Sequence, residues 1–539
     1  MGRTPTPVDP TAGPAEAGQS LAIVLVALAL LATIPLAIVS STMKQLPLTS
    51  QNIDYNAAFE AAQAGLNDYI EHLNSDQNYI VYSASNPPPD GNQAFASWVP
   101  VPGPPTNPSE YFRYSPDITT ATQTGIVTLS ISGKAGPVSS GLVRTFQVGL
   151  RREGFLDFIY FTDYETVDPA SYGNQSAQAQ AQCQFHMYDP NPVTGGTGPA
   201  SPFCNNPEFI TADVLHGPVH SNDGFNICGN PTFTASVTSS DPKAPRWVND
   251  GCSSTPSFAR AGDPAYQATM AIPPTDSTLK AQVTIGQAGA GCLYTGPTSV
   301  ALHTNGTMDV TSPETKSTNV GCGPGNGLAL PANGLIYVQN VPASSADPNY
   351  SASCVAANNP IANHSCSNGD AIVQNAASTG GLKGRLTIAT DDDIIITGNL
   401  TYAGGLAGSD VLGLIADQFI EVNHPVSGSS NASTCGSGGG TGCDLSSPTI
   451  DAAMLTLGHS YQTDNYAIGS PLGTITVNGS IAQKFRGAVG THSGGTIVSG
   501  YAKNYVYDPR LMYLSPPFYL SPVASAWHPL SFAEVKRAF

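Results

Sequence analysis

The sequence predicts a mainly β protein with one long N-terminal helix, anchored in a membrane. An apolar run without charged residues lies near the N-terminus, and short apolar segments separated by Gly, Asn, Pro and Ser fill the larger C-terminal part. Short strands joined by such turns are typical of a β-solenoid, in which each coil covers the open edge of its neighbour. We therefore expect a right-handed parallel β-helix as the ectodomain, with a Greek-key β-sandwich as the alternative.

The first two segments of the chain are a polar leader at 1–17 and a predicted transmembrane helix at 18–41. No charged residue stands between Glu16 and Lys44, and Leu21–Val39 is almost entirely Leu, Ile, Val and Ala. A helix of about 20 such residues crosses the hydrocarbon core of a bilayer. A cleavable signal peptide is the alternative, but its apolar region is shorter and follows a basic start. We expect a single-pass membrane protein with a cytoplasmic leader and an extracytoplasmic ectodomain at the cell surface.

Residues 42–76 form a predicted amphipathic extension of this helix. The apolar side chains recur at steps of three and four, which places them on one stripe of a helix: Tyr55, Phe59, Ala62, Leu66, Tyr69 or Ile70, and Leu73. Two interpretations are open. The segment can be a surface helix packed on the domain that follows, or a spine that runs from the membrane helix into a globular head.

The two N-terminal segments resemble those of PilX-like minor pilins and type IV pilus-assembly proteins. In that family a glycine precedes the apolar helix, as in Gly18–Leu25, and an A-x-x-A-A-x-A-G-L pattern follows, as in Ala57–Leu66. The resemblance covers the N-terminal part only. It implies processing at Gly18 and packing against other pilin-like subunits or assembly machinery. One departure is Ile23, which stands where pilins usually carry a glutamate that pairs with a neighbour's N-terminus.

The region 77–167 is predicted to be a pilin-like head with an antiparallel sheet, covered on one face by the amphipathic helix. After a Pro-rich stretch, apolar and polar residues alternate with a period of two, which indicates β-strands. The predicted strands are Tyr111–Tyr114, Ile126–Ile131, Leu142–Leu150 and Phe155–Thr162.

The region 168–500 is the predicted β-helix-like ectodomain, with a Gly/Ser-rich loop insertion at 423–447. Its expected strands include Arg385–Ala389, Ile394–Leu400, Val411–Ala416, Phe419–Val422, Met454–Leu457 and Ile475–Ile481. Earlier apolar residues expected to point inward are Val219, Phe225, Ile227, Phe233 and Val237. An exposed solenoid end invites aggregation, so the aromatic and Pro-rich segment 501–539 is expected to cap the last coil.

Ten cysteines are spread singly along the ectodomain, and none forms a C-x-x-C pair. Structural disulfides in an oxidising compartment fit this pattern, and buried free thiols are the alternative. If sequence neighbours pair, the bridges are Cys183–Cys204, Cys228–Cys252, Cys292–Cys322, Cys354–Cys366 and Cys435–Cys443. A net charge of -18 argues against a nucleic-acid partner, because phosphate binding requires basic patches.

Few residues of the sequence suggest catalysis or metal binding. The strongest polar group is His216, His220, Ser221, Asn222 and Asp223, which could supply metal ligands or an acid–base pair. His216, His220 and Asp223 are the metal-ligand candidates, since two histidines an even number of residues apart share one face of a strand. Gly217 and Pro218 interrupt that strand, however, which favours a structural role.

A second candidate is the run Asp391, Asp392 and Asp393, which could bind calcium or act on polysaccharide; the alternative is an exposed turn whose side chains cap backbone amides. Asp163 and Glu165 form a weaker acid pair. We predict no catalytic residue and no cofactor.

Taken together, these patterns favour a pilin-like structural, assembly or adhesion protein with the membrane, other pilin-like subunits and surface glycans as partners. The alternative, from a different class, is a membrane-anchored β-helix protein that binds polysaccharide or cleaves it as a lyase or hydrolase. That alternative places its site at Asp391–Asp393 or at the His216–Asp223 cluster.

Overall fold

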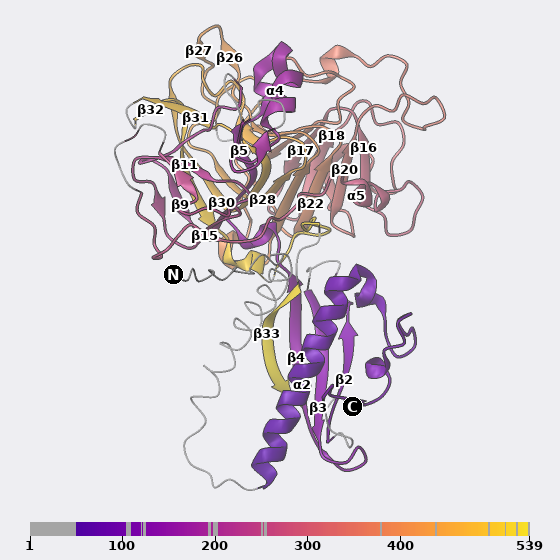
Figure 1. Cartoon of the computed structure of the whole chain (residues 1–539). Helices are drawn as coiled ribbons and strands as arrows, with labels where there is room; N and C mark the ends of the chain where they lie inside the picture. Colours follow the sequence, from indigo (N-terminus) through magenta and orange to yellow (C-terminus); the bar gives the residue numbers. More distant parts are fainter. Residues whose placement is uncertain are drawn as a thin grey trace, which may run out of the picture.

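The computed structural model describes residues 50–103, 109–119, 121, 126–191, 196–197, 203–249, 252, 256–377, 380–436, 439–493, 496–512, 514–523 and 527–536. The predicted leader, the predicted transmembrane helix at 18–41 and the predicted processing residue Gly18 lie outside these ranges. Within them, no helix is both long and apolar enough to span a bilayer. Figure 1 shows a small α/β domain below a large β-rich body.

The small domain is an antiparallel sheet of five strands covered by one helix. The sheet order is β1-β2-β3-β4-β33, and each neighbouring pair is antiparallel. Its elements are α2 (Ser50–Ser75), β1 (Val99–Pro100), β2 (Glu110–Asp117), β3 (Ile126–Ala135), β4 (Leu142–Arg152) and β33 (Trp527–Val535), with 3-10 turns η1 (Gln77–Val81) and η2 (Gln93–Phe95).

Small residues bring α2 and the sheet into close contact. Ala58, Ala61 and Ala62 are fully buried, and a Cβ atom on Gly133 of β3 would lie only 2.0 Å from the carbonyl oxygen of Ala58. The alanine-rich pattern of the sequence therefore marks the line where the helix backbone rests on β3. The predicted stripe is also found, because Leu66, Tyr69 and Leu73 are buried, whereas Tyr55 is 44% exposed.

The body contains a large sheet whose principal strands are all parallel. Its order is β15-β13-β10-β5-β30-β28-β24-β22-β20-β16. These strands are β5 (Tyr160–Val167), β10 (Val219–Ser221), β13 (Val237–Ser239), β15 (Ala265–Tyr266), β16 (Cys292–Thr295), β20 (Leu335–Gln339), β22 (Arg385–Thr390), β24 (Val411–Ala416), β28 (Thr449–Thr456) and β30 (Pro471–Arg486). A branch at β30 adds β9 (Val214–His216), β12 (Thr232–Phe233), β31 (Gly490–Ser493) and β32 (Thr496–Tyr507).

A second sheet of seven strands faces the first across the apolar core. Its order is β19-β18-β17-β21-β23-β25-β29, and the pairs from β17 through β21, β23 and β25 to β29 are parallel. The strands are β17 (Thr298–Leu302), β18 (Thr307–Thr311), β19 (Gly325–Ala329), β21 (Ala371–Asn375), β23 (Ile394–Ile396), β25 (Ile420–Val422) and β29 (Tyr461–Thr463). In β23, Ile394 and Ile396 join the core between the sheets, and Ile395 belongs to a separate cluster.

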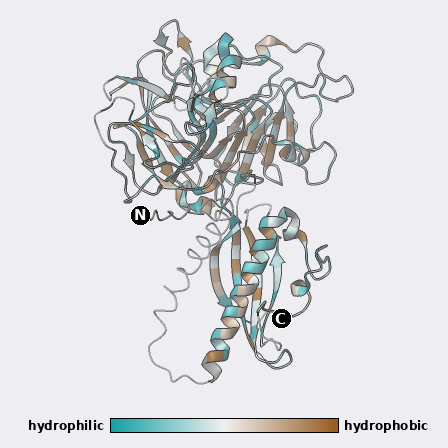
Figure 2. Cartoon of the chain, in the orientation of Figure 1, coloured by the Kyte–Doolittle hydropathy of each residue, from teal (hydrophilic) through white to brown (hydrophobic). Residues whose placement is uncertain are grey.

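The remaining elements are short. They are β6 (Pro190–Asn191), β7 (Gly196–Thr197), β8 (Phe209–Ile210), β11 (Phe225–Cys228), β14 (Trp247–Val248), β26 (Val426–Ser427), β27 (Ser430–Asn431), α4 (Ser176–Cys183) and α5 (Ser277–Ala281), with 3-10 turns η3 (Phe155–Asp157), η4 (Pro169–Gln175), η5 (Ala356–Asn358), η6 (Gly405–Ala407) and η7 (Pro509–Met512). In Figure 2 the apolar colouring follows the strands of the body.

The path of the chain through the large sheet is not sequential. The chain enters at β5 in the middle of the sheet and moves outward to β15. Residues 267–291, here called the crossover segment, then lead to β16 at the opposite end, and the later strands return until β30 pairs with β5. The crossover segment packs on the outer face of the sheet through Met270, Leu279 and Val283. The first and the last principal strands of the body are therefore neighbours.

The prediction of a mainly β fold is confirmed, and most strands of the two main sheets of the body pair in parallel rather than in the antiparallel order of a Greek-key sandwich. The inward residues expected near the start of the ectodomain, from Val219 to Val237, all lie in the main core. The cysteines form disulfides, which join Cys183–Cys204, Cys228–Cys252, Cys292–Cys322, Cys354–Cys366 and Cys435–Cys443. The last of these closes a loop within the predicted insertion 423–447, which also holds the β26–β27 hairpin.

Two predicted boundaries are corrected. The segment Phe155–Thr162, expected in the small sheet, forms η3 and then the start of β5 in the large sheet. The segment 501–539 does not serve only as a cap over the last coil: its first residues finish β32, Tyr519 packs against the outer side of the large sheet, and β33 joins the small domain. The reason is the free edge of β4, which β33 covers with an antiparallel ladder from Thr145 to Arg152 that contains one register shift. The body is thus inserted between two neighbouring strands of the small domain.

Candidate functional site

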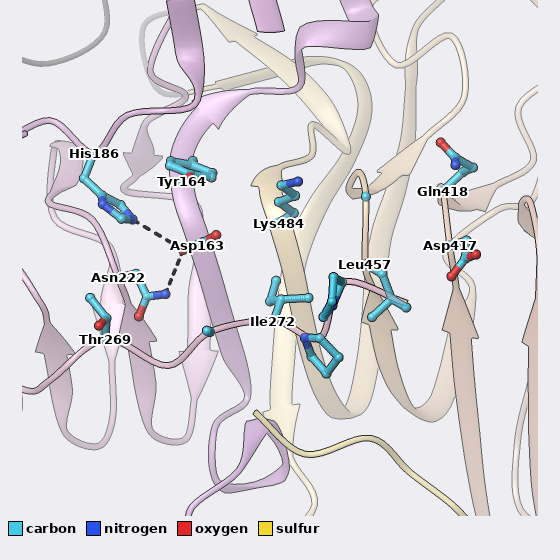
Figure 3. A pocket seen from close by; sticks show the side chains of 14 residues that line it. Asp163, Tyr164, His186, Asn222, Thr269, Ile272, Asp417, Gln418, Leu457 and Lys484 are labelled. Atoms are coloured by element: carbon cyan, nitrogen blue, oxygen red, sulfur yellow. Dashed lines mark hydrogen bonds and ion pairs between the residues drawn. The ribbon is translucent and has the colours of Figure 1, made fainter. Parts of the chain in front are cut away.

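A polar cavity of the body lies where the crossover segment passes over the large sheet. Its volume is about 580 Å³. Asp163 and Tyr164 of β5 and Lys484 of β30 form one side, and the residues that follow β24 and β28 form another. The crossover segment supplies Thr269 and Ile272, as Figure 3 shows. The carboxyl ends of parallel strands meet at this edge, which is why residues distant in sequence converge here.

His186 lies against Asp163 in this cavity. Its Nε2 atom is 3.3 Å from Asp163 Oδ1, and its Nδ1 atom is 2.9 Å from Asp189 Oδ2. The ring stacks between Tyr164 and Tyr188, at 4.8 and 5.2 Å between centroids. Burial alone lowers the pKa of His186, but its hydrogen bond to Asp163 and the neighbouring carboxylates outweigh it and raise the pKa to about 9. The cavity therefore contains an imidazolium at neutral pH.

Asn222, which follows β10, ties the crossover segment to the sheet. Its Nδ2 donates to Asp163 Oδ1 at 2.8 Å and to the carbonyl oxygen of Met270 at 2.9 Å, and its Oδ1 accepts from the N–H of Met270 at 2.9 Å. The two hydrogen bonds between the Asn222 side chain and the backbone of Met270 have the same donor and acceptor pattern as those between neighbouring β-strands. Asp163 Oδ1 thus lies within hydrogen-bond distance of both His186 and Asn222 (Figure 3).

A carboxylate cluster begins at the far side of the same cavity with Asp417, which follows β24. One carboxylate oxygen each from Asp276, Asp391 and Asp417 lies within 4.8 Å of the others. The hydroxyl of Tyr337 donates to Asp276 Oδ1 at 2.7 Å and contacts Asp391 Oδ1 at 2.5 Å. Burial raises the pKa of Asp276 to about 6 and that of Asp417 to about 7, and the neighbouring carboxylates add to the rise.

A second acidic cluster lies on the outer side of the seven-stranded sheet. His364 Nδ1 is 3.1 Å from Asp370 Oδ2 and 3.6 Å from Asp393 Oδ2, and its Nε2 atom is 3.9 Å from Glu421 Oε2. Hydrogen bonding to Asp370, together with the nearby carboxylates, raises the pKa of His364 to about 9. Asn359 donates to Asp370 Oδ2 at 2.7 Å, and the N–H of Phe419 donates to Asp393 Oδ1 at 2.8 Å. The carboxylates of this cluster therefore have hydrogen-bond and ion-pair partners within the protein.

The structure does not bring the predicted histidine cluster together as a metal site. His216 is exposed on β9, which pairs with β12 and β32, whereas His220 is buried on β10 between β5 and β13. Both ring nitrogens of His220 are used, by Thr238 Oγ1 at 2.9 Å and by Asn222 Oδ1 at 3.3 Å. Burial lowers its pKa to about 4, so the ring is neutral.

Asp223 also serves the fold rather than a metal. Its carboxylate accepts from the backbone N–H groups of Met187, Gly224 and Glu165, at 2.7, 2.8 and 3.2 Å. Burial raises its pKa to about 7. The side chain therefore holds the loop that positions His186, which gives it an indirect role at the cavity.

The three predicted aspartates after β22 separate into two clusters. Asp391 joins Asp276 and Asp417 at the cavity, and Asp393 joins the cluster around His364 on the other sheet. Asp392 lies between them, and burial raises its pKa to about 6. The prediction found the right segment, but the chain turns there from one sheet to the other, so the carboxylates point apart.

The sequence prediction missed His186, Asp276, Asp417 and Lys484. Each stands alone in sequence or next to unrelated residues, and no spacing marks it. Only the parallel stacking of the strands brings them together. The weak acid pair also divides, because Asp163 faces the cavity whereas Glu165 is buried and pairs with Arg486 at 2.8 Å.

Comparison of the chain with family models, with curated proteins and with solved structures found no match in any of the three.

Proposed function

We propose that this protein is a membrane-anchored, surface-exposed pilin-like structural or assembly protein whose small domain carries the β-rich body. The observation that supports the proposal most directly is the insertion of the body between β4 and β33, which are neighbours in the small sheet. Both chain connections of the body thus return to the domain built around α2. This arrangement suits a helix α2 that is anchored at its N-terminal side and carries the large β-rich body.

The contacts of Arg144 on β4 support this carrier role. Its guanidinium donates to both carboxylate oxygens of Glu534 on β33, each at 2.9 Å, and lies 3.7 Å from the ring centre of Tyr55 on α2. One side chain therefore connects the helix, the strand before the body and the strand after it. Bidentate arginine–carboxylate pairs have a defined geometry, which suits a junction that transmits load.

We also propose that the two parallel sheets of the body are the faces of a β-solenoid, in the form of a right-handed parallel β-helix. The parallel registers support this, since strands of successive coils lie directly above one another, as in Ile394 with Ile420 and Ile420 with Tyr461. Antiparallel β18 and β19 cover one end of the seven-stranded sheet. A covered end protects the open edge that a stack of coils would otherwise expose.

Shearing tests the pilin-like proposal. Cells that produce the full chain are sheared, and the protein is measured by immunoblot in the filament fraction and in the membrane fraction, with mass spectrometry of the N-terminus to detect cleavage at Gly18. Ile53 of α2 is 62% exposed, and we expect Ile53→Asp to reduce the filament-bound protein at least tenfold, because it places a charge on an exposed apolar position of the helix that would pack against other subunits. Val320→Asp, on the fully exposed Val320 of the body, is the matched control. Recovery of the wild-type protein solely as a lone membrane monomer would refute the proposal.

A second candidate function is binding of a polar glycan in the cavity beside the crossover segment. The observation that favours it is the mixed polar lining, with the imidazolium of His186, the Lys484 side chain and Asp417 around about 580 Å³. Purified protein is titrated with acidic and neutral oligosaccharides and assayed for their cleavage. Binding that is lost in Lys484→Met but kept in Glu421→Gln supports this function. Equal binding by both variants, or none by the wild type, counts against it.

A further inference from the structure

The carboxylate cluster beside the cavity joins three distant parts of the chain. Asp276 precedes α5 in the crossover segment, Asp391 follows β22, and Asp417 follows β24. One oxygen from each lies within 4.8 Å of the others. An ion bound at 2.3–2.6 Å can bridge oxygens up to about 5 Å apart, so the three carboxylates can share one cation.

Two oxygens of this cluster have no hydrogen-bond partner among the residues that the structure describes. Asp276 is only 2% exposed, and its Oδ1 accepts from Tyr337, while its Oδ2 is buried without a hydrogen bond among the described residues. Asp417 Oδ1 is likewise buried and without a hydrogen-bond partner in the described part of the chain. A buried acceptor without a partner is destabilising, and more so if it is charged. Two such oxygens within one carboxylate cluster leave acceptors available to a positively charged ligand.

The charges at the cluster do not balance. The charged groups that act on Asp417 are the carboxylates of Asp276, Asp391 and Asp392 and the ammonium of Lys280. Lys280 Nζ lies 2.8 Å from Asp391 Oδ2, and its side chain is 41% exposed. When all three carboxylates of the cluster are ionised, one ammonium against them leaves two negative charges, which is the charge that one divalent cation neutralises.

We propose that Asp276, Asp391 and Asp417 bind one Ca²⁺ ion at the edge of the cavity. Carboxylate oxygens are the ligands that Ca²⁺ prefers, and its remaining positions are filled by water from the cavity, which Asp417 also lines. The Lys280 ammonium stays at Asp391 Oδ2, where the N–H of Asn340 also donates at 2.9 Å, and the ion uses the remaining lone pairs of the three carboxylates. Tyr337 orients Asp276 and Asp391 from behind, as outer groups do at metal sites.

The bound ion would fasten the crossover segment to the large sheet. This segment connects the outer strand β15 with the opposite end of the sheet, and the ion would join its midpoint to the ends of β22 and β24. The site is therefore a structural clamp that also presents a cation to the cavity. This inference is independent of the pilin-like function proposed above.

Two other groups of potential ligands serve as comparisons. Cys228 and Cys252, which lie with Glu208, are joined in a disulfide and cannot bind a metal as thiolates. In the cluster of His364, Asp370 and Asp393, hydrogen bonds from Asn359 and from the backbone occupy the carboxylates, and a histidine supplies the positive charge. This second cluster provides the control variant.

The test uses the full chain in detergent micelles, freed of metal with a chelator. Isothermal titration calorimetry with CaCl₂ and, separately, MgCl₂ measures affinity and stoichiometry, and thermal unfolding is followed with and without 5 mM CaCl₂, a concentration on the order of the weaker Ca²⁺ sites of proteins. We expect one Ca²⁺ per chain, weaker binding of Mg²⁺ and a melting temperature that rises with Ca²⁺. Asp417→Asn and Asp276→Asn should each weaken Ca²⁺ binding at least tenfold, whereas Glu421→Gln should change it less than twofold.

The opposite results are equally clear. If the wild-type protein shows neither heat of binding nor a rise in melting temperature, the carboxylates are neutralised by protons and the proposal fails. It also fails if Asp417→Asn binds Ca²⁺ as tightly as the wild type. Because the asparagine variants keep the shape of the side chain and remove a buried charge, we expect them to fold; circular dichroism checks this, and the wild-type melting shift tests the proposal without them.

Discussion

The contact between α2 and β3 leads to the sharpest prediction, which concerns Gly133. A Cβ atom at this position would lie 2.0 Å from the carbonyl oxygen of Ala58 and 2.3 Å from the backbone nitrogen of Ala62. Non-bonded heavy atoms pack at about 3.5–4.0 Å, so Gly133→Ala must move the helix away from the sheet by more than about 1 Å. No side chain can rotate to avoid this clash, because both contacted atoms belong to the backbone.

The cost follows from the residues that the displacement would uncover. Leu66, Tyr69 and Leu73 are buried under the same helix and lose contact when it lifts. Overpacking a core typically costs about 1–3 kcal/mol, and we expect Gly133→Ala at the upper end or above it. Gly133→Val should cost more. The matched control is Gly154→Ala, since a Cβ there meets its nearest atom at 3.7 Å, which is an ordinary contact.

Urea unfolding of the full chain, followed by tryptophan fluorescence, measures the effect. Two of the three tryptophans, Trp98 and Trp527, lie in or beside the small sheet, and Trp247 lies in the body, so fluorescence reports mainly on the small domain. Such a two-domain chain need not unfold in one step, so the two transitions are fitted separately. The small-domain midpoint should fall by about 1 M urea or more in Gly133→Ala. A midpoint equal to that of Gly154→Ala would refute the close approach of α2 to β3.

Two further predictions concern buried charges in the body. Arg486 on β30 and Glu165 on β5 form a buried ion pair at 2.8 Å, so Arg486→Met leaves Glu165 buried without this partner and should destabilise the body by about 3–5 kcal/mol. The double variant Arg486→Met/Glu165→Leu should recover stability. Equal stability of the single and the double variant in urea unfolding would contradict the pairing. The pKa of His186 is raised to about 9 in the folded state, so its stabilising effect is complete below pH 6.5 and is lost as the pH rises through about 9. Wild type should therefore lose about 2–3 kcal/mol more than His186→Gln between pH 6 and pH 10, and parallel unfolding curves for the two proteins would exclude a protonated histidine.

Much of the local structure could be predicted from the sequence. The helical stripe, the small antiparallel strands and most strands of the body follow from periods of 3.6 and 2, because the side of an element that is buried repeats with its own geometry. Val411–Ala416, for example, is a strand over its full predicted range. The candidate site could not be predicted in the same way. Asp391 was identified as one member of an acidic run, but its functional neighbours Asp276 and Asp417 lie in other segments that no local pattern connects.

The sequence by itself determined which segments are apolar and periodic, and it therefore determined that the chain builds a helix-backed sheet and a β-rich body. Tertiary structure alone decided that β33 pairs with β4 and that β30 pairs with β5. Both pairings join strands hundreds of residues apart, and any exposed strand edge can in principle accept any apolar strand. The choice depends on which edges remain open once everything else has packed. The cavity and the carboxylate cluster arise from the same choice, because they form only where the crossover segment passes over the completed sheet.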